Sequence, residues 1–130
     1  MTTDTLRDLA SGTNFAVIST LMPDGRPQTQ VMWVDYEEGR ILLNTEVHRQ
    51  KYRNLQRDPR VTVTIWAMAN PYSYVEVRGV VEEFIRGPAA LEHIDRLALK
   101  YTGSPFRREG ITSERVILRI KPDKQVTYGR

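Results

Sequence analysis

The amino-acid sequence predicts a mainly β fold with short helices, in which six or seven antiparallel strands form a barrel. Segments with the composition of β-strands follow one another along the chain, and most of them are separated by hairpin turns. The segments typical of helices are few and short, which argues against a doubly wound parallel sheet. The length of 130 residues predicts a single domain over 1–130.

The first half of the chain is expected to contain one helix and three strands. The elements, in order, are a helix over 3–11, a strand over 15–21, a turn over 22–27, a strand over 27–36, a turn over 37–40 and a strand over 41–45. The strand over 15–21 is mostly apolar, so we expect it to be buried on both faces. Pro23, Asp24 and Gly25 are typical of a tight turn, in which glycine supplies the positive φ.

The second half is expected to contain two helices and three further strands. The elements are a helix over 48–57, a strand over 61–67, a turn at 70–71, a strand over 74–84, a helix over 88–101, a polar loop over 102–114, and a last strand over 115–120 that continues as an edge or tail over 125–129. Gly79 suggests a bulge, and Pro122 is expected to interrupt the last strand. His93 is expected on the helix surface.

Composition and local patterns exclude several classes of protein. The absence of cysteine excludes disulfides and thiol nucleophiles, and two histidines are too few for a histidine-based metal site, so we expect no metal. No apolar run approaches the roughly 18 residues of a membrane helix. The N-terminus also lacks the pattern of a secretory signal. We therefore expect a cytoplasmic protein with no membrane partner.

The basic segment 49–60 carries five positive groups and one negative group in a chain whose net charge is +3. A helix that begins near His48 would direct free N–H groups toward an anion, to which Arg49 and Lys51 add positive charge. Asn54 can share a helix face with Lys51, and the Thr45 hydroxyl lies just before the helix. These residues indicate a phosphate site, although a solvated helix whose charges serve solubility explains the same pattern.

The strand over 27–36 offers a second candidate surface. Gln30, Met32 and Trp33 would present backbone amides and a flat apolar surface to a ring system, although core packing explains the same residues. The chain contains no recognisable catalytic triad, metalloprotease motif or nucleotide-binding glycine loop. If the protein is an enzyme, a cofactor must therefore supply the chemistry, and no catalytic side chain is predicted.

Four segments carry a resemblance to a known family. They are FAVIST at 15–20, DGRPQ at 24–28, KYRNLQRDPRV at 51–61 and YVEVRG at 74–79. In these segments, and in the order of its elements from about Leu6 to Tyr128, the chain resembles the flavin and deazaflavin oxidoreductases of the split β-barrel superfamily, which are related to pyridoxamine 5′-phosphate oxidase. The resemblance implies a fold of the FMN-binding split-barrel type and a homodimer with two cofactor sites at the subunit interface.

The resemblance also implies roles for individual residues. Arg49, Lys51 and Asn54 are the expected residues of the phosphate end of the cofactor, with Thr45 and Glu46 beside them. The strand residues expected along the tricyclic ring are Gln30, Val31, Met32 and Trp33. Two aromatic residues are expected nearer the substrate, namely Trp66 and Tyr128.

The short chain most resembles the branch that uses coenzyme F420. It lacks the longer C-terminal extension typical of true pyridoxamine phosphate oxidases, so we do not expect that activity. The basic excess also favours F420, whose oligoglutamate tail is polyanionic. The implied function is hydride transfer between F420 and a small organic substrate. The alternatives are an FMN-dependent enzyme and a non-catalytic flavin or F420 carrier. A nucleic-acid module that binds through 49–60 is not expected, because the aromatic motifs of RNA-binding folds are absent.

Overall fold

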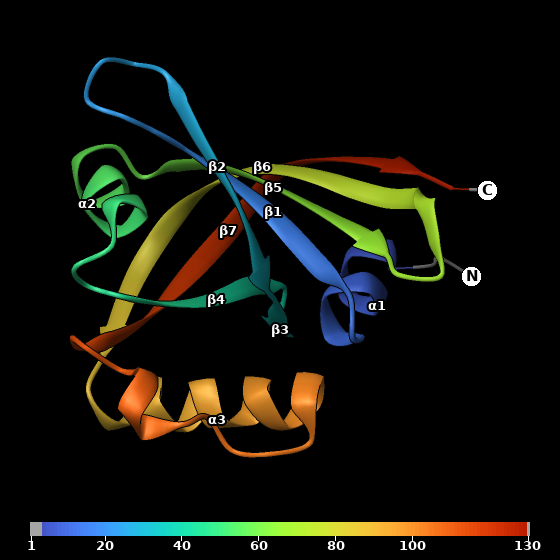
Figure 1. Ribbon diagram of the computed structural model, residues 1–130. Helices are drawn as coiled ribbons and strands as arrows, with labels where there is room; N and C mark the ends of the chain where they lie inside the picture. Colours follow the sequence, from blue (N-terminus) through green and yellow to red (C-terminus); the bar gives the residue numbers. More distant parts are fainter. Residues whose placement is uncertain (1–3, 130) are drawn as a thin grey trace.

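The structure is a computed structural model that describes residues 4–129, in which seven antiparallel strands curl into a half-barrel (Figure 1). The strands are β1 (Phe15–Leu21), β2 (Pro27–Trp33), β3 (Asp35–Glu37), β4 (Arg40–Glu46), β5 (Arg60–Ala67), β6 (Asn70–Arg86) and β7 (Arg115–Tyr128). The helices are α1 (Thr5–Ser11), α2 (Gln50–Arg57) and α3 (Pro88–Thr102), and a single 3-10 turn, η1, spans Arg108–Gly110. The predicted mainly β, antiparallel class is confirmed.

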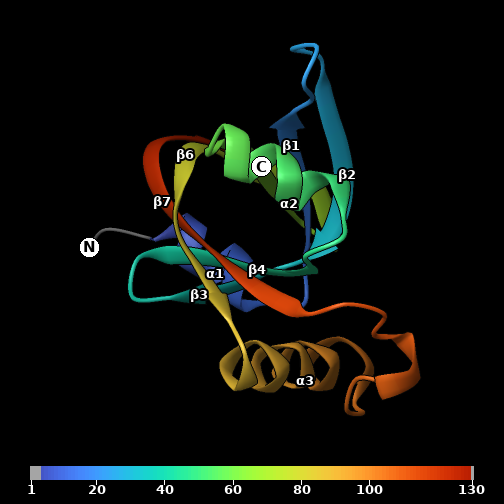
Figure 2. The same cartoon turned by 90° about the vertical axis from the view of Figure 1, so that its left-hand side faces the viewer.

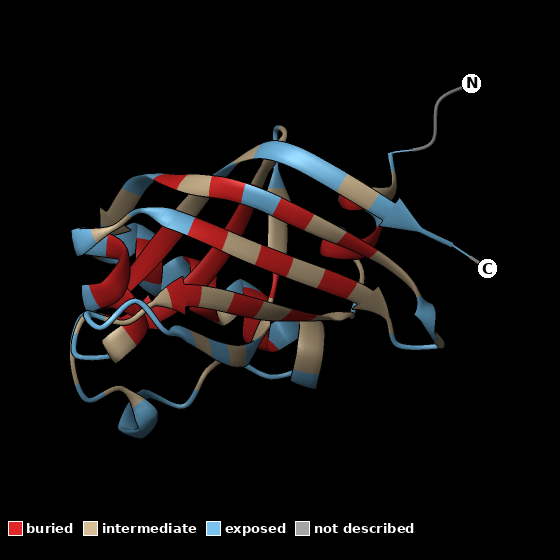
Figure 3. Ribbon diagram, turned by 90° about the horizontal axis from the view of Figure 1, so that it is seen from above, coloured by how far each residue is buried: buried red, intermediate tan, exposed pale blue. Residues whose placement is uncertain are grey.

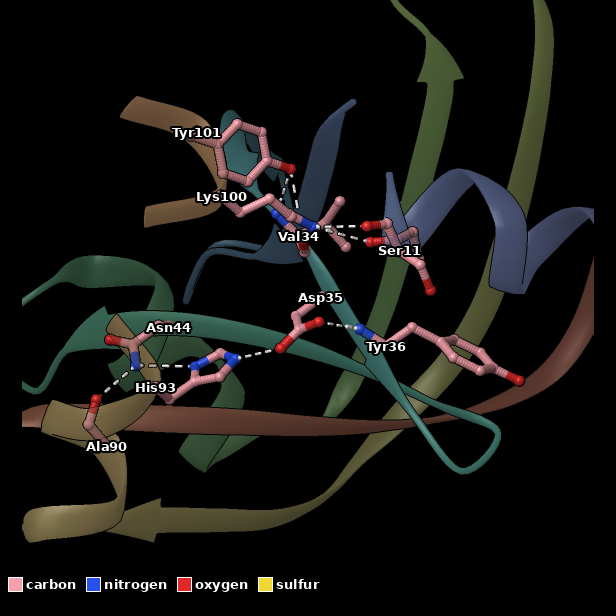
Figure 4. Close-up of polar contacts among 10 residues, drawn as sticks. Ser11, Val34, Asp35, Tyr36, Asn44, Ala90, His93, Lys100 and Tyr101 are labelled. Carbon is pink, nitrogen blue, oxygen red and sulfur yellow. Dashed lines mark hydrogen bonds and ion pairs between the residues drawn. The ribbon is translucent and has the colours of Figure 1, made fainter. Parts of the chain in front are cut away.

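The strand order explains how the sheet curls. Neighbouring strands follow the order β2-β1-β5-β6-β7-β4-β3, so the two edge strands are consecutive in the sequence and only Val34 separates them. The expectation of one strand over 27–36 is therefore wrong, because the chain passes at Val34 from one edge of the sheet to the other. The corner is held from α3: the Val34 N–H donates to the Tyr101 hydroxyl at 3.1 Å, and Lys100 Nζ donates to the Val34 carbonyl at 2.6 Å (Figure 4).

The core fills the inside of the curled sheet. Along β1, buried residues such as Ala16 and Ile18 alternate with partly exposed ones, so the expectation that this strand is buried on both faces is wrong for the single chain. Figure 3 shows the same alternation along neighbouring strands. Tyr52 and Leu55 of α2 close one end of the core, and Leu6 of α1 belongs to the other end (Figures 1 and 2).

Three helices differ in detail from the expectation. The first spans Thr5–Ser11, and residue 3 of the expected helix over 3–11 lies outside the described residues. The helix expected from residue 48 begins at Gln50, with Arg49 as its N-cap residue. His93 of α3 is not on the surface as expected but fully buried, because polar groups of β3 and β4 provide its partners.

Gly79 of β6 and Pro122 of β7 lie opposite each other in the sheet. The bulge expected at Gly79 is confirmed by a shift in the β6–β7 register between Arg78 and Gly79. A Cβ at Gly79 would lie 2.1 Å from the Lys121 carbonyl oxygen, so only glycine fits there. Pro122 does not interrupt β7 as expected, because beyond Ile120 this strand pairs with β6 alone and is an edge, where proline is tolerated.

The hairpin turns lie at or close to the positions that the sequence predicts. Glu38 and Gly39 both have positive φ, 49° and 81°, as the tight turn between β3 and β4 requires. The expected turn at 70–71 lies two residues earlier, because Ala67 pairs with Asn70 across the β5–β6 hairpin. The polar loop after α3 contains η1 and leads back to the start of β7.

Candidate functional site

A cavity of about 430 Å³ opens between the edge strand β2, the β4–α2 connection, α3 and the start of β7. This volume falls in the range of roughly 300–1,000 Å³ that is usual for small-molecule sites. Its lining residues are Phe15, Gln30, Val31, Met32, Trp33, Asn44, Thr45, Arg49, Lys51, Ile94, Leu97, Phe106 and Arg115. They divide into an aromatic and aliphatic part and a cationic part.

The aromatic part is rigid because its rings pack on one another. The Trp33 ring stacks on Tyr101 with centroids 5.1 Å apart and an angle of 4° between the planes, and the Phe106 ring meets Trp33 edge-on. Tyr101 also stacks on Phe15 at 5.6 Å. Within residues 4–129, β2 pairs with β1 only, so its other edge leaves backbone N–H and C=O groups free for a ligand.

The cationic part contains positive side chains without protein partners. Lys51, in the first turn of α2, is only 7% exposed, yet within residues 4–129 its ammonium makes no hydrogen bond or ion pair. The Arg49 guanidinium also has no such partner in the described chain. Burial lowers the pKa of the Lys51 ammonium from its ordinary 10.5, and the charges of Arg49 and Arg115 lower this pKa further. A buried, unpaired ammonium is costly unless an anion joins it.

Arg115 is the third cation of the cavity and, unlike the other two, it is held by protein groups. Its Nε donates to Asn44 Oδ1 at 2.8 Å, and its Nη1 lies 3.4 Å from Glu46 Oε2. The guanidinium also lies over the Phe106 ring, 5.3 Å from the centroid. Burial lowers the pKa of Arg115, and the Glu46 charge opposes that shift.

Two of the residues predicted for the site, Glu46 and Asn54, do not line the cavity but make hydrogen bonds to segments beside it. Glu46 Oε1 accepts the backbone N–H groups of Thr112 and Ser113, both at 2.7 Å. Burial raises the pKa of the Glu46 carboxyl, but these two hydrogen bonds and the Arg115 charge outweigh burial and lower it. Asn54 is fully buried and donates to Thr20 Oγ1 at 3.0 Å, which ties α2 to β1.

Most of the predicted residues come together at this one cavity. The seven that line it are Gln30, Val31, Met32, Trp33, Thr45, Arg49 and Lys51. Trp66 and Tyr128, expected nearer the substrate, do not line it. Sequence reasoning missed Asn44 and Arg115, although each is a polar residue in or beside an apolar strand segment, a pattern that could have indicated them.

Comparison with known proteins identifies the family. The family model described as pyridoxamine 5′-phosphate oxidase matches residues 2–127. The chain belongs to the pyridoxamine 5′-phosphate oxidase family. The split barrel of this family binds flavins such as FMN, and the family is of a flavin or deazaflavin oxidoreductase type.

Several solved structures are similar over nearly the whole chain. A protein named F420 Reductase is 28% identical, with a TM-score of 0.79 over 92% of this chain and 94% of that one. A conserved hypothetical protein from Mycobacterium tuberculosis is also 28% identical, with a TM-score of 0.78 over 98% of this chain and 84% of that one. General Stress Protein 26 from Bacillus anthracis str. Sterne, 20% identical with a TM-score of 0.73 over 96% and 92% of the two chains, shows the same fold.

Two further searches of the described residues concern metals and membranes. Residues 4–129 contain no group of three or more His, Cys, Asp or Glu side chains arranged to hold a metal ion. In the same part of the chain, no helix combines the length and the apolar character that crossing a bilayer requires.

Proposed function

We propose that this protein is an F420-dependent oxidoreductase, which transfers a hydride between the deazaflavin and a small organic substrate. The observation that carries the proposal is the buried Lys51 ammonium, which lines the cavity and has no protein anion beside it in residues 4–129. A ligand phosphate would supply the missing negative charge.

The start of α2 is suited to hold that phosphate. The backbone N–H groups of Gln50 and Lys51 have no backbone acceptor in the described chain, as expected for the first turn of a helix. Arg49 adds a second positive charge at the cavity, and the Thr45 hydroxyl lies in the same wall. Asn54 acts indirectly, because its hydrogen bonds to β1 and β2 fix the position of the helix.

The edge of β2 is suited to hold the ring. Its free backbone groups can bond the polar edge of a tricyclic ring, and Met32 and Trp33 provide an apolar surface beside it. When bound, the deazaflavin would supply a hydride to the organic acceptor, and a proton from solvent would complete the reduction. The protein's contribution is to orient the ring, align the substrate and exclude water, so no obligatory side-chain base is assigned.

FMN is the second candidate cofactor. The family model is named for an oxidase, and the fold of this family binds FMN. F420 is preferred because the similarity to the protein named F420 Reductase extends over 92% of this chain, and because unpaired positive charge at the cavity favours a more anionic ligand. A non-catalytic carrier would use the same contacts and differ only in the absence of turnover.

We also propose that the active form is a homodimer. Five aromatic residues lie directly opposite one another across five strands, on the sheet face that points away from the core: Trp33, Phe15, Trp66, Tyr74 and Tyr128. Beside this row, Val31 is 64% exposed and belongs to the cavity wall. A second copy on this face would cover the row and complete the cavity. Sedimentation should therefore give twice the chain mass of 15.0 kDa, and a monomer at micromolar concentration would contradict the dimer.

Fluorescence titration with F420 and with FMN tests the cofactor proposal. Wild-type protein should bind F420 more tightly than FMN, and Lys51→Ala should weaken F420 binding about ten- to hundredfold, as expected for a lost charged hydrogen bond. Lys124→Ala removes the same charge from an exposed position and should leave the affinity unchanged.

The other outcomes separate the alternatives. A yellow purified protein with bound FMN would favour the second candidate, and F420 binding without reduction of any acceptor in a substrate screen would favour the carrier. Equal affinities of wild type and Lys51→Ala would overturn the assignment of the anion site.

A further inference from the structure

A series of hydrogen-bonded polar side chains, of which His93 and Asn44 are buried and Asp35 and Arg115 half-buried, leads from β3 to the wall of the cavity. Asp35 Oδ2 lies 3.0 Å from His93 Nε2, and His93 Nδ1 lies 3.1 Å from Asn44 Nδ2 (Figure 4). Asn44 Oδ1 then accepts from Arg115 Nε at 2.8 Å. Asn44 and Arg115 line the cavity, whereas His93 is 0% exposed and does not line it.

For each hydrogen bond in this series, the chemistry of the groups fixes which one donates and which one accepts. Arg115 can only donate, so the oxygen of the Asn44 amide must face it, and the Asn44 NH₂ group must face the other way. There the NH₂ group donates to the Ala90 carbonyl at 2.9 Å and to His93 Nδ1. Because Nδ1 accepts, the His93 proton is on Nε2, from which it is donated to the Asp35 carboxylate.

Asp35 is held in the ionised form that this arrangement requires. Burial raises the pKa of the Asp35 carboxyl, but the hydrogen bonds from His93 and from the Tyr36 N–H outweigh burial and lower it. The His93 ring therefore meets an acceptor on one side and a donor on the other. If the ring turned over, or if Nδ1 gained a proton, the Asn44 NH₂ group would lose one of its two acceptors and meet a donor in its place, and only the Ala90 carbonyl would still favour the orientation with the Asn44 oxygen toward Arg115.

We propose that His93 and Asp35 are positioning residues, which act through Asn44 to hold the Arg115 guanidinium in the cavity, ready to contact the negative group of the ligand. The proposal rests on the proposed function, because Arg115 needs an anionic ligand to contact. An arginine side chain loses rotamer entropy when it is fixed. A guanidinium that is already fixed in the free protein avoids much of this loss on binding, and the ligand binds more tightly as a result.

A double-mutant cycle distinguishes positioning from simple core packing. His93→Leu should weaken F420 binding about tenfold, whereas His93→Gln, which keeps one acceptor and one donor, should restore the affinity to within about twofold of wild type. In an Arg115→Gln background, His93→Leu should have no further effect on affinity, because its effect passes through Arg115. A purely structural histidine would give the same loss of affinity in both backgrounds, and that result would overturn the proposal.

Nuclear magnetic resonance of the ligand-free protein tests the same series of hydrogen bonds without any cofactor. In wild type, His93 should be the Nε2–H tautomer, and the Arg115 Nε–H signal should be slow to exchange with solvent. In His93→Leu that signal should exchange at least tenfold faster. An Nδ1–H tautomer in wild type, or an unchanged Arg115 signal in His93→Leu, would contradict the positioning role. If neither F420 nor FMN binds while these signals behave as expected, the proposed function fails and the positioning of Arg115 stands.

Discussion

The two halves of the basic segment 49–60 differ in what their positive charges contact. Arg53 donates to the His48 carbonyl at 2.7 Å, and Arg57 donates to the Leu21 carbonyl. Arg60 forms an ion pair with Asp58 at 2.7 Å, which lowers the pKa of that carboxyl to about 2. In the first half, by contrast, the charged groups of Arg49 and Lys51 have no hydrogen-bond or ion-pair partner within residues 4–129, and both residues line the cavity.

This difference shows that cations with hydrogen-bond or ion-pair partners in the protein serve the fold, whereas cations without such partners are available to a ligand. The local density of charge does not separate the two groups. An exposed pair such as Arg60 and Asp58 contributes little to stability, because solvent screens its charges. A buried lysine without a partner lowers stability instead, and such a residue is expected where function requires it. The sequence alone gives no sign of this distinction, because all five cations occur within twelve residues of one another.

Among the exposed cations of the segment, the largest expected contrast is between Arg49→Ala and Arg60→Ala. Both substitutions remove one guanidinium from the same segment, but only Arg49 belongs to the cavity wall. Arg49→Ala should weaken F420 binding about five- to tenfold, a modest loss because the side chain is exposed and solvent screens its charge. Arg60→Ala should leave binding unchanged. Isothermal titration of both variants at one salt concentration measures the contrast, and equal losses would indicate a diffuse electrostatic effect of the segment instead of a defined site.

Much of the fold could be predicted because its signals are local. The hairpin turns, the alternation along the strands and the bulge at Gly79 depend on neighbouring residues. The break at Val34 could not be predicted in this way, because its cause is distant in the sequence: the side chains that hold the corner belong to Lys100 and Tyr101, 66 and 67 residues away. The residues next to Val34 in the sequence give no indication of such distant partners.

The site was predictable in part for the same reason. The residues of β2 and of the β4–α2 connection are grouped in the sequence, and the family resemblance includes them. Arg115 reaches the site only because β7 pairs with β4, which places Arg115 opposite Glu46. His93 appeared to be a surface residue because its partners, Asp35 and Asn44, are 58 and 49 residues away. Residues that act through tertiary contacts of this kind require the structure.

The smallest expected effect is on the free energy of unfolding of the ligand-free protein. This effect tests the comparison between cations with and without protein partners most directly. Lys51→Met keeps the aliphatic stem and removes a buried, unpaired charge, so it should raise the free energy of unfolding by about 1 kcal/mol while it weakens F420 binding. The exposed Lys124 is the matched control, and Lys124→Met should change neither quantity. Urea denaturation of the three ligand-free proteins measures the difference.

The gain from Lys51→Met should also depend on pH, with a sign that follows from burial. Because the pKa of Lys51 in the folded protein lies below the 10.5 of the unfolded chain, the unfolded state binds more protons between these two values. Wild-type stability therefore rises with pH in that interval, relative to a variant that cannot titrate. The advantage of Lys51→Met should be complete below the folded-state pKa and should shrink as the pH approaches 10.5. A variant less stable than wild type at pH 7 would identify Lys51 as an ammonium that the fold itself stabilises, and Lys51 would then belong with Arg53, Arg57 and Arg60.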